Sequence, residues 1–207
     1  MNSLLNDIYR AVLSVAFACA VLLQFLILQY SGFDSELYRM SVPLICTFPF
    51  SCAWLDESAS GMTRLMLHRT SVLWYIAGKF TACALSGGLA EWLAAFVFTR
   101  LQHQPMPENA ALIFLCGAFW AGIAAWLAAA SRSKHSAYGG AFVLCYFLVI
   151  LHERYLPHCQ YVDPFEWLAP KTDWMFGQAG VRLMLVGMTA LTGIAYANIL
   201  EGRLSRG

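Results

Sequence analysis

The chain has 207 residues, of which 59% are hydrophobic and 12% are charged, with a formal net charge of +1. Ordinary soluble domains carry about 25% charged residues, and a single core of this size could not bury so much apolar surface. The composition predicts an integral membrane protein. It excludes the basic stripe of a nucleic-acid-binding domain. The seven cysteines form no CxxC pair, so neither a zinc site nor a disulfide framework is expected.

Six apolar segments predict membrane spans, since a spanning helix needs about 20 mostly apolar residues. They cover residues 11–30, 38–55, 78–99, 110–130, 137–152 and 181–200. The second is short and contains Pro43 and Pro49, which spans tolerate where neighbours satisfy the freed backbone groups. We therefore expect an all-α membrane protein with a single transmembrane domain over residues 1–207.

The Lys and Arg residues are divided unevenly between the two sides of these spans. One set of flanks holds eight, namely Arg10, Arg64, Arg69, Lys79, Arg132, Lys134, Arg203 and Arg206. The other set holds five, namely Arg39, Arg100, Arg154, Lys171 and Arg182. Because cytoplasmic loops carry an excess of Lys and Arg, the first side is expected to be cytoplasmic. The prediction is a multi-pass protein of a bacterial cell membrane with both termini in the cytoplasm.

The most polar internal segment joins the second and third spans and reads DESASGMTRLMLHRTSVLWYIAGK. In this orientation it is the longest cytoplasmic loop. Within it, residues 62–74 fit a short amphipathic helix. Leu65, Met66, Arg69 and Leu73 follow spacings of three and four, and Arg64 and His68 form a pair on another face. The alternative is a loop whose basic residues only fix the topology.

The same segment carries a pattern of single residues. An acid is followed by a Gly, a leucine-containing turn, an Arg-Thr-Ser turn, an aromatic residue and a Gly-Lys pair. These are Glu57, Gly61, Leu65, Leu67, Arg69-Thr70-Ser71, Tyr75 and Gly78-Lys79. The pattern resembles the type-2 ABC transporter permease family, as do six spans and a large external loop before the last one. The Pro that often follows the leucine turn in that family is replaced here by Leu67-His68-Arg69.

The resemblance implies a permease that pairs with a second copy or a similar chain and docks cytoplasmic ATPase subunits. Residues 60–71 would be a coupling helix, residues 131–136 a smaller coupling element, and the first ten residues an interfacial helix. The implied coupling residues are Glu57, Gly61, Arg64, Leu65, His68, Arg69, Arg132 and Lys134. Glu57 would lie at the base of the second span, where it orders the loop or pairs with a basic residue. ATP and Mg²⁺ would bind only to the partner ATPase, since this chain has no GxxxxGK[ST] phosphate loop and is not expected to be an enzyme.

Glu91 lies near the middle of the third predicted span. A carboxyl group at that depth is costly and indicates a functional site by default, here a substrate or cation contact in a dimer cavity. The alternative is a protonated, hydrogen-bonded carboxyl group that holds helices together. Gly87 and Gly88 precede Glu91 by about one helical turn and predict a close approach of a neighbouring helix.

The external loop over residues 152–180 is rich in aromatic residues, including Phe165 and Trp167. The resemblance implies short re-entrant helices here that cap the external mouth of a substrate pathway. Single aromatic residues in this loop also fit an aromatic belt at the membrane surface. His152, Glu153 and His158 lack the spacing of a metal site on one helix, so no metal is expected.

These observations predict the permease subunit of an ATP-driven exporter that works by alternating access. The substrate is expected to be amphipathic or hydrophobic, such as a drug, an antimicrobial peptide or a lipid-like molecule. Two alternatives stay open. A membrane-embedded enzyme would need a catalytic motif, and neither GxSxG nor HExxH is present. An ATP-independent small transporter often has broken helices in matching positions, whereas only the second span here has a pair of prolines.

Overall fold

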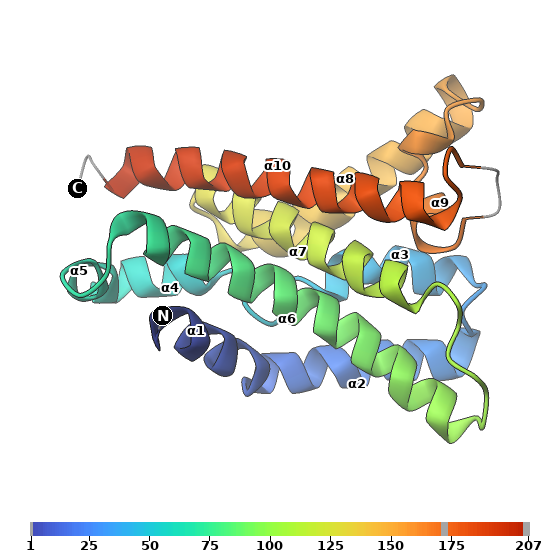
Figure 1. The fold of residues 1–207 in the computed structure, drawn as a ribbon, viewed down its shortest axis with the longest axis horizontal. Coiled ribbons are helices and arrows are strands. Elements are labelled where there is room, and N and C mark those ends of the chain that lie inside the picture. The colour runs from blue at the N-terminus through green and yellow to red at the C-terminus, as the bar shows by residue number, and fades with distance from the viewer. Residues whose placement is uncertain (1, 171–173, 205–207) are drawn as a thin grey trace.

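The computed structural model describes residues 2–170 and 174–204, which form helices and turns with no strand (Figure 1). The helices are α1 (Asn2–Val12), α2 (Val15–Ser31), α3 (Glu36–Ile45), α4 (Ala53–Ala59), α5 (Met62–Leu67), α6 (Val72–Leu101), α7 (Ala110–Ser131), α8 (Lys134–Tyr155), the 3-10 helix η1 (Gln160–Val162), α9 (Pro164–Leu168) and α10 (Gln178–Leu204). The expected all-α architecture is confirmed. Lys171 and Arg206, which contribute to the predicted orientation in the membrane, lie outside the described residues.

Four helices are long and apolar enough to cross a membrane, namely α6, α7, α8 and α10. A fifth candidate is the pair α1 and α2, which are bent by 49° relative to each other. The bend follows from a new helix start: the hydroxyl of Ser14 accepts a hydrogen bond from the Phe17 amide and caps α2. A multi-pass helical protein is therefore confirmed in outline. Among the described residues there are four candidate membrane spans, or five if the bent pair counts as one span, rather than the six expected.

The missing candidate is the second expected span, residues 38–55, which is not one helix. Helix α3 ends at Ile45, residues 46–52 form turns, and α4 begins at Ala53. Pro49 lies in these turns and has no amide hydrogen to continue a helix. The amide of Phe48 instead donates to the Ile45 carbonyl in a tighter turn. The expectation of one continuous helix over residues 38–55 was therefore wrong. The segment consists of α3 and α4, separated by the turns over residues 46–52.

The boundaries around α5 also differ from the sequence-based expectation. The expected amphipathic helix over residues 62–74 is too long, because α5 ends at Leu67. The chain then turns, and Ser71 adopts an extended conformation with ψ of 150°. Helix α6 begins at Val72, six residues before the expected start of the third span. The residues between Val72 and Lys79 therefore continue the third span as a helix.

Helices α6 and α7 pack closely at the centre of the bundle. A Cβ atom added to Gly117 of α7 would lie 2.8 Å from Cγ of Glu91 and 2.9 Å from the Gly87 carbonyl oxygen, both on α6. A Cβ atom on Gly88 would lie 2.6 Å from the Phe114 carbonyl oxygen. Small residues allow helix backbones to approach in this way. The close approach expected at Gly87 and Gly88 is confirmed.

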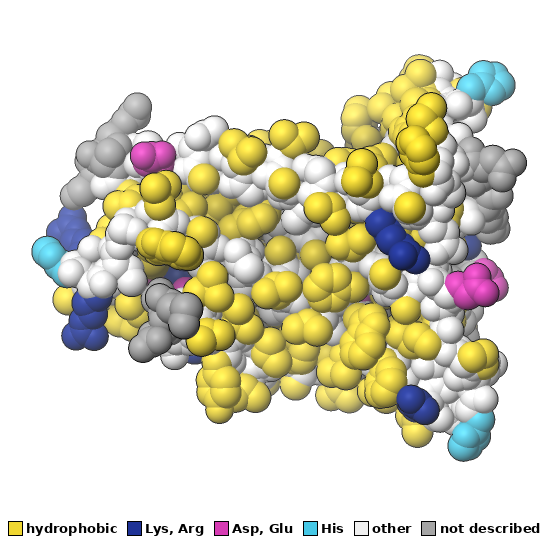
Figure 2. Space-filling model, viewed as in Figure 1, with side chains coloured by type: hydrophobic (Ala, Val, Ile, Leu, Met, Phe, Trp, Pro, Cys, Tyr) yellow, Lys and Arg dark blue, Asp and Glu magenta, His cyan; other side chains and the backbone are white. Residues whose placement is uncertain are grey.

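The two ends of the bundle differ in what they carry. Helix α1 begins and α10 ends at the end that holds α4 and α5, whereas α9 lies at the opposite end (Figure 1). On the face shown in Figure 2, charged side chains gather toward the two ends and apolar side chains cover most of the surface between them. This pattern fits a protein that spans a membrane with its long axis across the bilayer. Which end faces the cytoplasm stays a prediction.

Candidate functional site at the α5 end of the bundle

A cluster of polar side chains connects α1, α4 and α6 at the base of the α5 segment. We call it the Lys79 cluster, and its members are Asp7, Arg10, Glu57, Tyr75 and Lys79. The Lys79 ammonium lies 2.7 Å from Oδ1 of Asp7 and 2.5 Å from Oε1 of Glu57. The Tyr75 hydroxyl donates to Oε2 of Glu57 at 2.9 Å, and Arg10 donates to Oε1 at 3.1 Å. Both oxygens of Glu57 are therefore bonded.

Burial makes these contacts important for stability. Asp7, Glu57 and Lys79 are 3%, 4% and 3% exposed, so all three charges are largely removed from water. Their burial is tolerated because two carboxylates face two cations, with Arg10 as the second. Removing one partner of such a group leaves an uncompensated buried charge, which is strongly destabilising. The Lys79 cluster therefore holds three helices in one arrangement.

The Gly78-Lys79 pair explains how α1 reaches α6. A Cβ atom on Gly78 would lie 3.8 Å from Cα of Leu4, so α1 passes directly over this position. The same Cβ atom would lie 3.6 Å from Oδ2 of Asp7. The small residue lets α1 approach, and the next residue supplies the ammonium group that binds Asp7. Sequence reasoning placed Lys79 in a motif but missed Asp7, whose signal was a single acid in an amphipathic helix.

Glu57 was expected either to order the loop or to pair with a basic residue. The pairing is confirmed, since Glu57 contacts both Lys79 and Arg10. A role in coupling to an ATPase stays a prediction. The contact to Lys79 joins the end of α4 to the start of α6, which are the two helices that flank α5. A displacement of α5 would therefore act on a connected pair of helices.

The α5 segment lies at the surface. Gly61 separates α4 from α5 with a φ of 74°, a left-handed conformation that disfavours residues with a Cβ atom. The side chain of Leu65 is 65% exposed, and Met62 is also exposed. The predicted coupling residues Arg64, His68 and Arg69 are exposed as well. The structure thus places five of the expected coupling residues, Gly61, Arg64, Leu65, His68 and Arg69, on one exposed segment. Glu57 is instead buried in α4, and the contact of any of these residues with a partner stays a prediction.

The smaller expected element, residues 131–136, lies beside α4. Arg132 adopts a left-handed conformation with φ of 57° in the turn between α7 and α8. The Lys134 ammonium lies 2.5 Å from Oδ1 of Asp56, and both side chains are more than half exposed. This contact places the smaller expected element beside α4, the helix that precedes the larger one.

Glu91 lies far from this end, buried between α6 and α7. It is 0% exposed, and neither carboxylate oxygen has a hydrogen-bond partner among the described residues. Its Cγ packs at the Gly117 position of α7. The proposed contact with a substrate or cation stays a prediction.

Sequence reasoning overlooked other buried polar groups in the spans. Gln24 of α2 accepts a hydrogen bond from the hydroxyl of Ser41 on α3 at 3.0 Å. Within the described chain, Nε2 of Gln24 and the Tyr38 hydroxyl have no partner. The signal for Gln24 was visible as an amide in an otherwise apolar run, whereas its partner depends on how α3 packs.

At the opposite end, Trp167 of α9 is buried in an aromatic group. Its ring stacks on Trp120 with centroids 6.0 Å apart and meets Phe119 edge-on. Trp120 lies ten residues into α7, which corresponds to about 15 Å of helix rise. Phe165 lies under the guanidinium of Arg39 at 5.8 Å. A short helix before the last span is therefore present, and its role as a cap of a substrate pathway stays a prediction.

No group of three or more His, Cys, Asp or Glu that could hold a metal ion occurs among residues 2–170 and 174–204. No family model, curated protein or solved structure matches the chain.

Proposed function

We propose that the chain is the transmembrane permease subunit of an ABC exporter, which pairs with a second permease and is driven by separate ATPase chains. The observation that carries the proposal is the combination of an exposed α5 segment with buried bonds at its base. Leu65 of α5 is available to a partner, and Glu57 and Lys79 connect the two flanking helices. A surface segment that transmits motion from a partner into the spans needs both an exposed contact residue and a connection to the neighbouring helices.

The geometry supports a route for motion from α5 into the membrane. A partner that displaces α5 would displace α4 and α6 together, because Glu57 of α4 bonds Lys79 and Tyr75 of α6. A displacement of α6 would also displace α7, because their backbones are in close contact at Gly117. The break over residues 46–52 would let α4 move without a rigid connection to α3. Alternating access needs such a coupled displacement of spans between two states.

The proposal includes six membrane crossings with both termini in the cytoplasm. They are α2, the broken pair α3 and α4, α6, α7, α8 and α10, with α1 lying in the interface and α9 re-entering from outside. Support comes from the shared end at which α1 begins and α10 ends, and from the depth of Trp167 beside Trp120. An amphipathic or hydrophobic substrate follows from the scarcity of charges in the spans, where Glu91 is the intramembrane exception that we assign to the pathway.

The test is co-purification of ATPase subunits with the tagged chain from the membrane of its native host. We expect the tagged chain to retain the ATPase and Leu65→Ser to lose it, with unchanged thermal unfolding because the side chain is 65% exposed. Leu101→Ser is the matched control, since Leu101 is 63% exposed at the opposite end of the bundle. If the native chain retains no ATPase, or if both variants retain it equally, the proposal is wrong. Transport by the purified chain without ATP would favour the ATP-independent transporter instead.

A further inference from the structure

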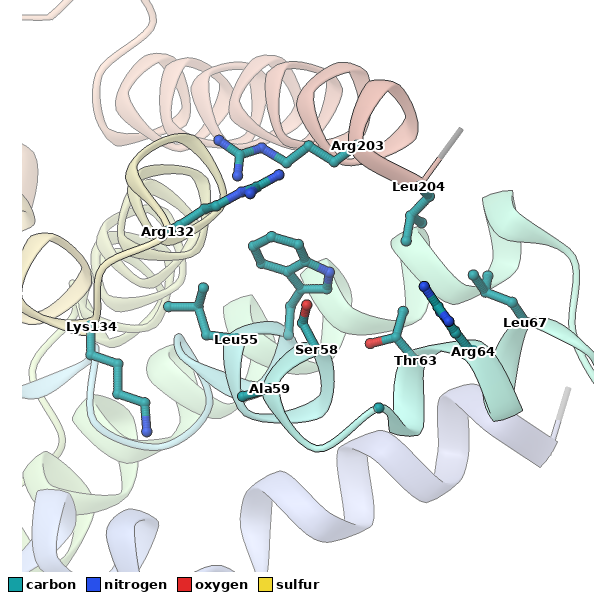
Figure 3. Close-up of a pocket in the computed structure, with 12 residues that line it drawn as sticks. Leu55, Ser58, Ala59, Thr63, Arg64, Leu67, Arg132, Lys134, Arg203 and Leu204 are labelled. Carbon is teal, nitrogen blue, oxygen red and sulfur yellow. The ribbon is translucent and has the colours of Figure 1, made fainter. Parts of the chain in front are cut away.

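A second feature of the α5 end is a cavity of about 540 Å³ between α4, α5, the turn joining α7 to α8, and the end of α10 (Figure 3). Its polar lining residues are Trp54, Thr63, Arg64, Arg132, Lys134 and Arg203, together with Ser58. Apolar side chains, including Leu204, complete the wall. The cavity is therefore amphipathic, with basic groups from three separate elements.

The positive charge in this cavity exceeds the nearby negative charge. Lys134 is paired with Asp56 at 2.5 Å. In the described part of the chain, no carboxylate lies within 4.0 Å of Arg132 or Arg203. Figure 3 shows the guanidinium groups of Arg132, from the turn between α7 and α8, and of Arg203, from α10, close together above the cavity. Two like charges held near each other favour an anion between them.

Several hydrogen-bonding groups in the lining also lack a partner. One nitrogen of Arg203, Nη2, donates to the Ala130 carbonyl at 2.6 Å. The other, Nη1, is buried without a partner among the described residues, as are Nε1 of Trp54 and the Thr63 hydroxyl. Trp54 and Thr63 are each 7% exposed. Leaving buried donors without acceptors is costly, so an acceptor-rich ligand would stabilise this site.

The position of the cavity narrows the choice of anion. Helix α7 ends at Ser131, α8 begins at Lys134 and α10 ends at Leu204, so three candidate spans reach their limit here. This is the depth of lipid headgroups if the apolar belt lies in the membrane. Trp residues favour that depth. Basic pockets between spans bind the headgroups of anionic lipids. The apolar wall that includes Leu55 and Leu204 would contact the glycerol and upper acyl region, which a free phosphate ion lacks.

We propose that this cavity binds the phosphate group of an anionic membrane lipid. Arg132 and Arg203 supply the charge, and Trp54 and Thr63 supply neutral donors. The lipid would join the end of α10 and the α7–α8 turn to α4 and α5, adding to the contacts of Lys134 with Asp56 and of the Arg203 guanidinium with the Trp54 ring. The inference requires the membrane location of the chain and not its proposed role in an exporter.

The experiment uses the full-length chain, purified in detergent and stripped of lipid, and counts bound phosphatidylglycerol by native mass spectrometry. Phosphatidylcholine tests the need for net negative charge, and inorganic phosphate tests the source of the phosphate. We expect one phosphatidylglycerol per chain, weaker binding of phosphatidylcholine, and no displacement by inorganic phosphate. Arg132→Gln should weaken phosphatidylglycerol binding about fivefold, and Arg132→Gln with Arg203→Gln more than that.

Arg69→Gln is the matched control, since Arg69 is an exposed cation at the same end that does not line the cavity. It should leave lipid binding unchanged. Arg132→Gln should fold normally, because the Arg132 side chain forms no hydrogen bond or ion pair with residues 2–170 or 174–204, and thermal unfolding verifies this. Equal binding of both lipids, equal loss in Arg69→Gln and Arg132→Gln, or displacement by inorganic phosphate would overturn the proposal. Displacement of the lipid by a partner ATPase whose retention requires Arg203 would assign the cavity to a protein contact instead.

Discussion

Glu57 and Glu91 are both buried glutamates, and their surroundings differ in one respect. Glu57 is 4% exposed, and its two oxygens are bonded to Arg10, Tyr75 and Lys79. Glu91 is 0% exposed, and in the described part of the chain neither oxygen has a partner. A buried carboxyl group without hydrogen bonds is costly, whereas a compensated one can be tolerated.

The difference reflects depth within the bundle. Near the α5 end, long side chains such as Arg10 and Lys79 lie along apolar surface and bring their charges to Glu57 from two other helices. Around Glu91, α6 and α7 approach each other at Gly117, and no cation from the described residues is bonded to the carboxyl group. We infer that Glu57 has a structural role, since its hydrogen-bond partners lie within the chain. We infer that Glu91 instead binds a partner, a substrate or a proton that the single chain does not supply.

The strongest test of this comparison is Lys79→Met. The substitution leaves Asp7 and Glu57 buried beside each other without the cation that joins them, so the free energy of unfolding should fall by about 3–5 kcal/mol. Denaturant unfolding in detergent micelles measures the change. Lys134→Met is the control, because its ion pair with Asp56 is exposed and should contribute nothing measurable. Equal effects of the two substitutions would contradict the structural importance of the Lys79 cluster.

The substitutions Glu57→Gln and Glu91→Gln both replace a carboxyl group by an amide, so their effects on stability can be compared directly. Glu57→Gln keeps the shape but removes the charge that Arg10 and Lys79 bind, and should lower the free energy of unfolding by about 1.5–3 kcal/mol. Glu91→Gln removes no hydrogen bond or ion pair formed with the described residues, so stability should change little. Thermal unfolding of both variants measures this contrast, and a larger loss in Glu91→Gln would reverse our interpretation.

Glu91→Gln also tests the proposed substrate pathway. If Glu91 contacts the substrate or a cation, export in reconstituted vesicles with the ATPase should fall more than expression does. Unchanged transport in a well-expressed variant would exclude the substrate contact and leave a role in helix packing.

The smallest expected effect concerns the packing that surrounds Glu91. Gly117→Ala places a Cβ atom 2.8 Å from Cγ of Glu91, so overpacking should lower stability by about 1–3 kcal/mol. In α8, Gly139→Ala meets no atom within 4 Å and should leave stability unchanged or slightly higher, because Ala favours helix. The difference in thermal unfolding between these two variants measures the closeness of α6 and α7. No difference would mean that α7 moves away freely at this point.

Much of the fold could be predicted because long apolar runs identify helices that cross a membrane. Helices α7, α8 and α10 include the expected segments 110–130, 137–152 and 181–200 with extensions of only a few residues. The second span was mispredicted because the composition of residues 38–55 does not reveal whether neighbours re-satisfy the backbone around Pro49. The early start of α6 was missed because its first residues were assigned to the polar segment that precedes them.

Of the candidate site, the sequence predicted the residues of the α5 segment, and pairing with a basic residue was one of the two roles expected for Glu57. It could not select Lys79 among the available cations, because Lys79 is 22 positions from Glu57 and meets it only in the folded chain. It could not find Asp7 either, because Asp7 is 72 positions from Lys79 and binds it only when α1 packs over Gly78. The cavity was not foreseen either, since Trp54, Arg132 and Arg203 come from three distant parts of the chain.

The sequence alone therefore determined that this chain is an apolar, helical membrane protein with one polar segment inside it, because bilayer thickness and backbone hydrogen bonding restrict spans to long apolar helices. Tertiary structure decided which buried charges are compensated. Charges interact through space over a few ångströms, and the distances from Lys79 to Asp7 and Glu57 exist only after three helices have packed.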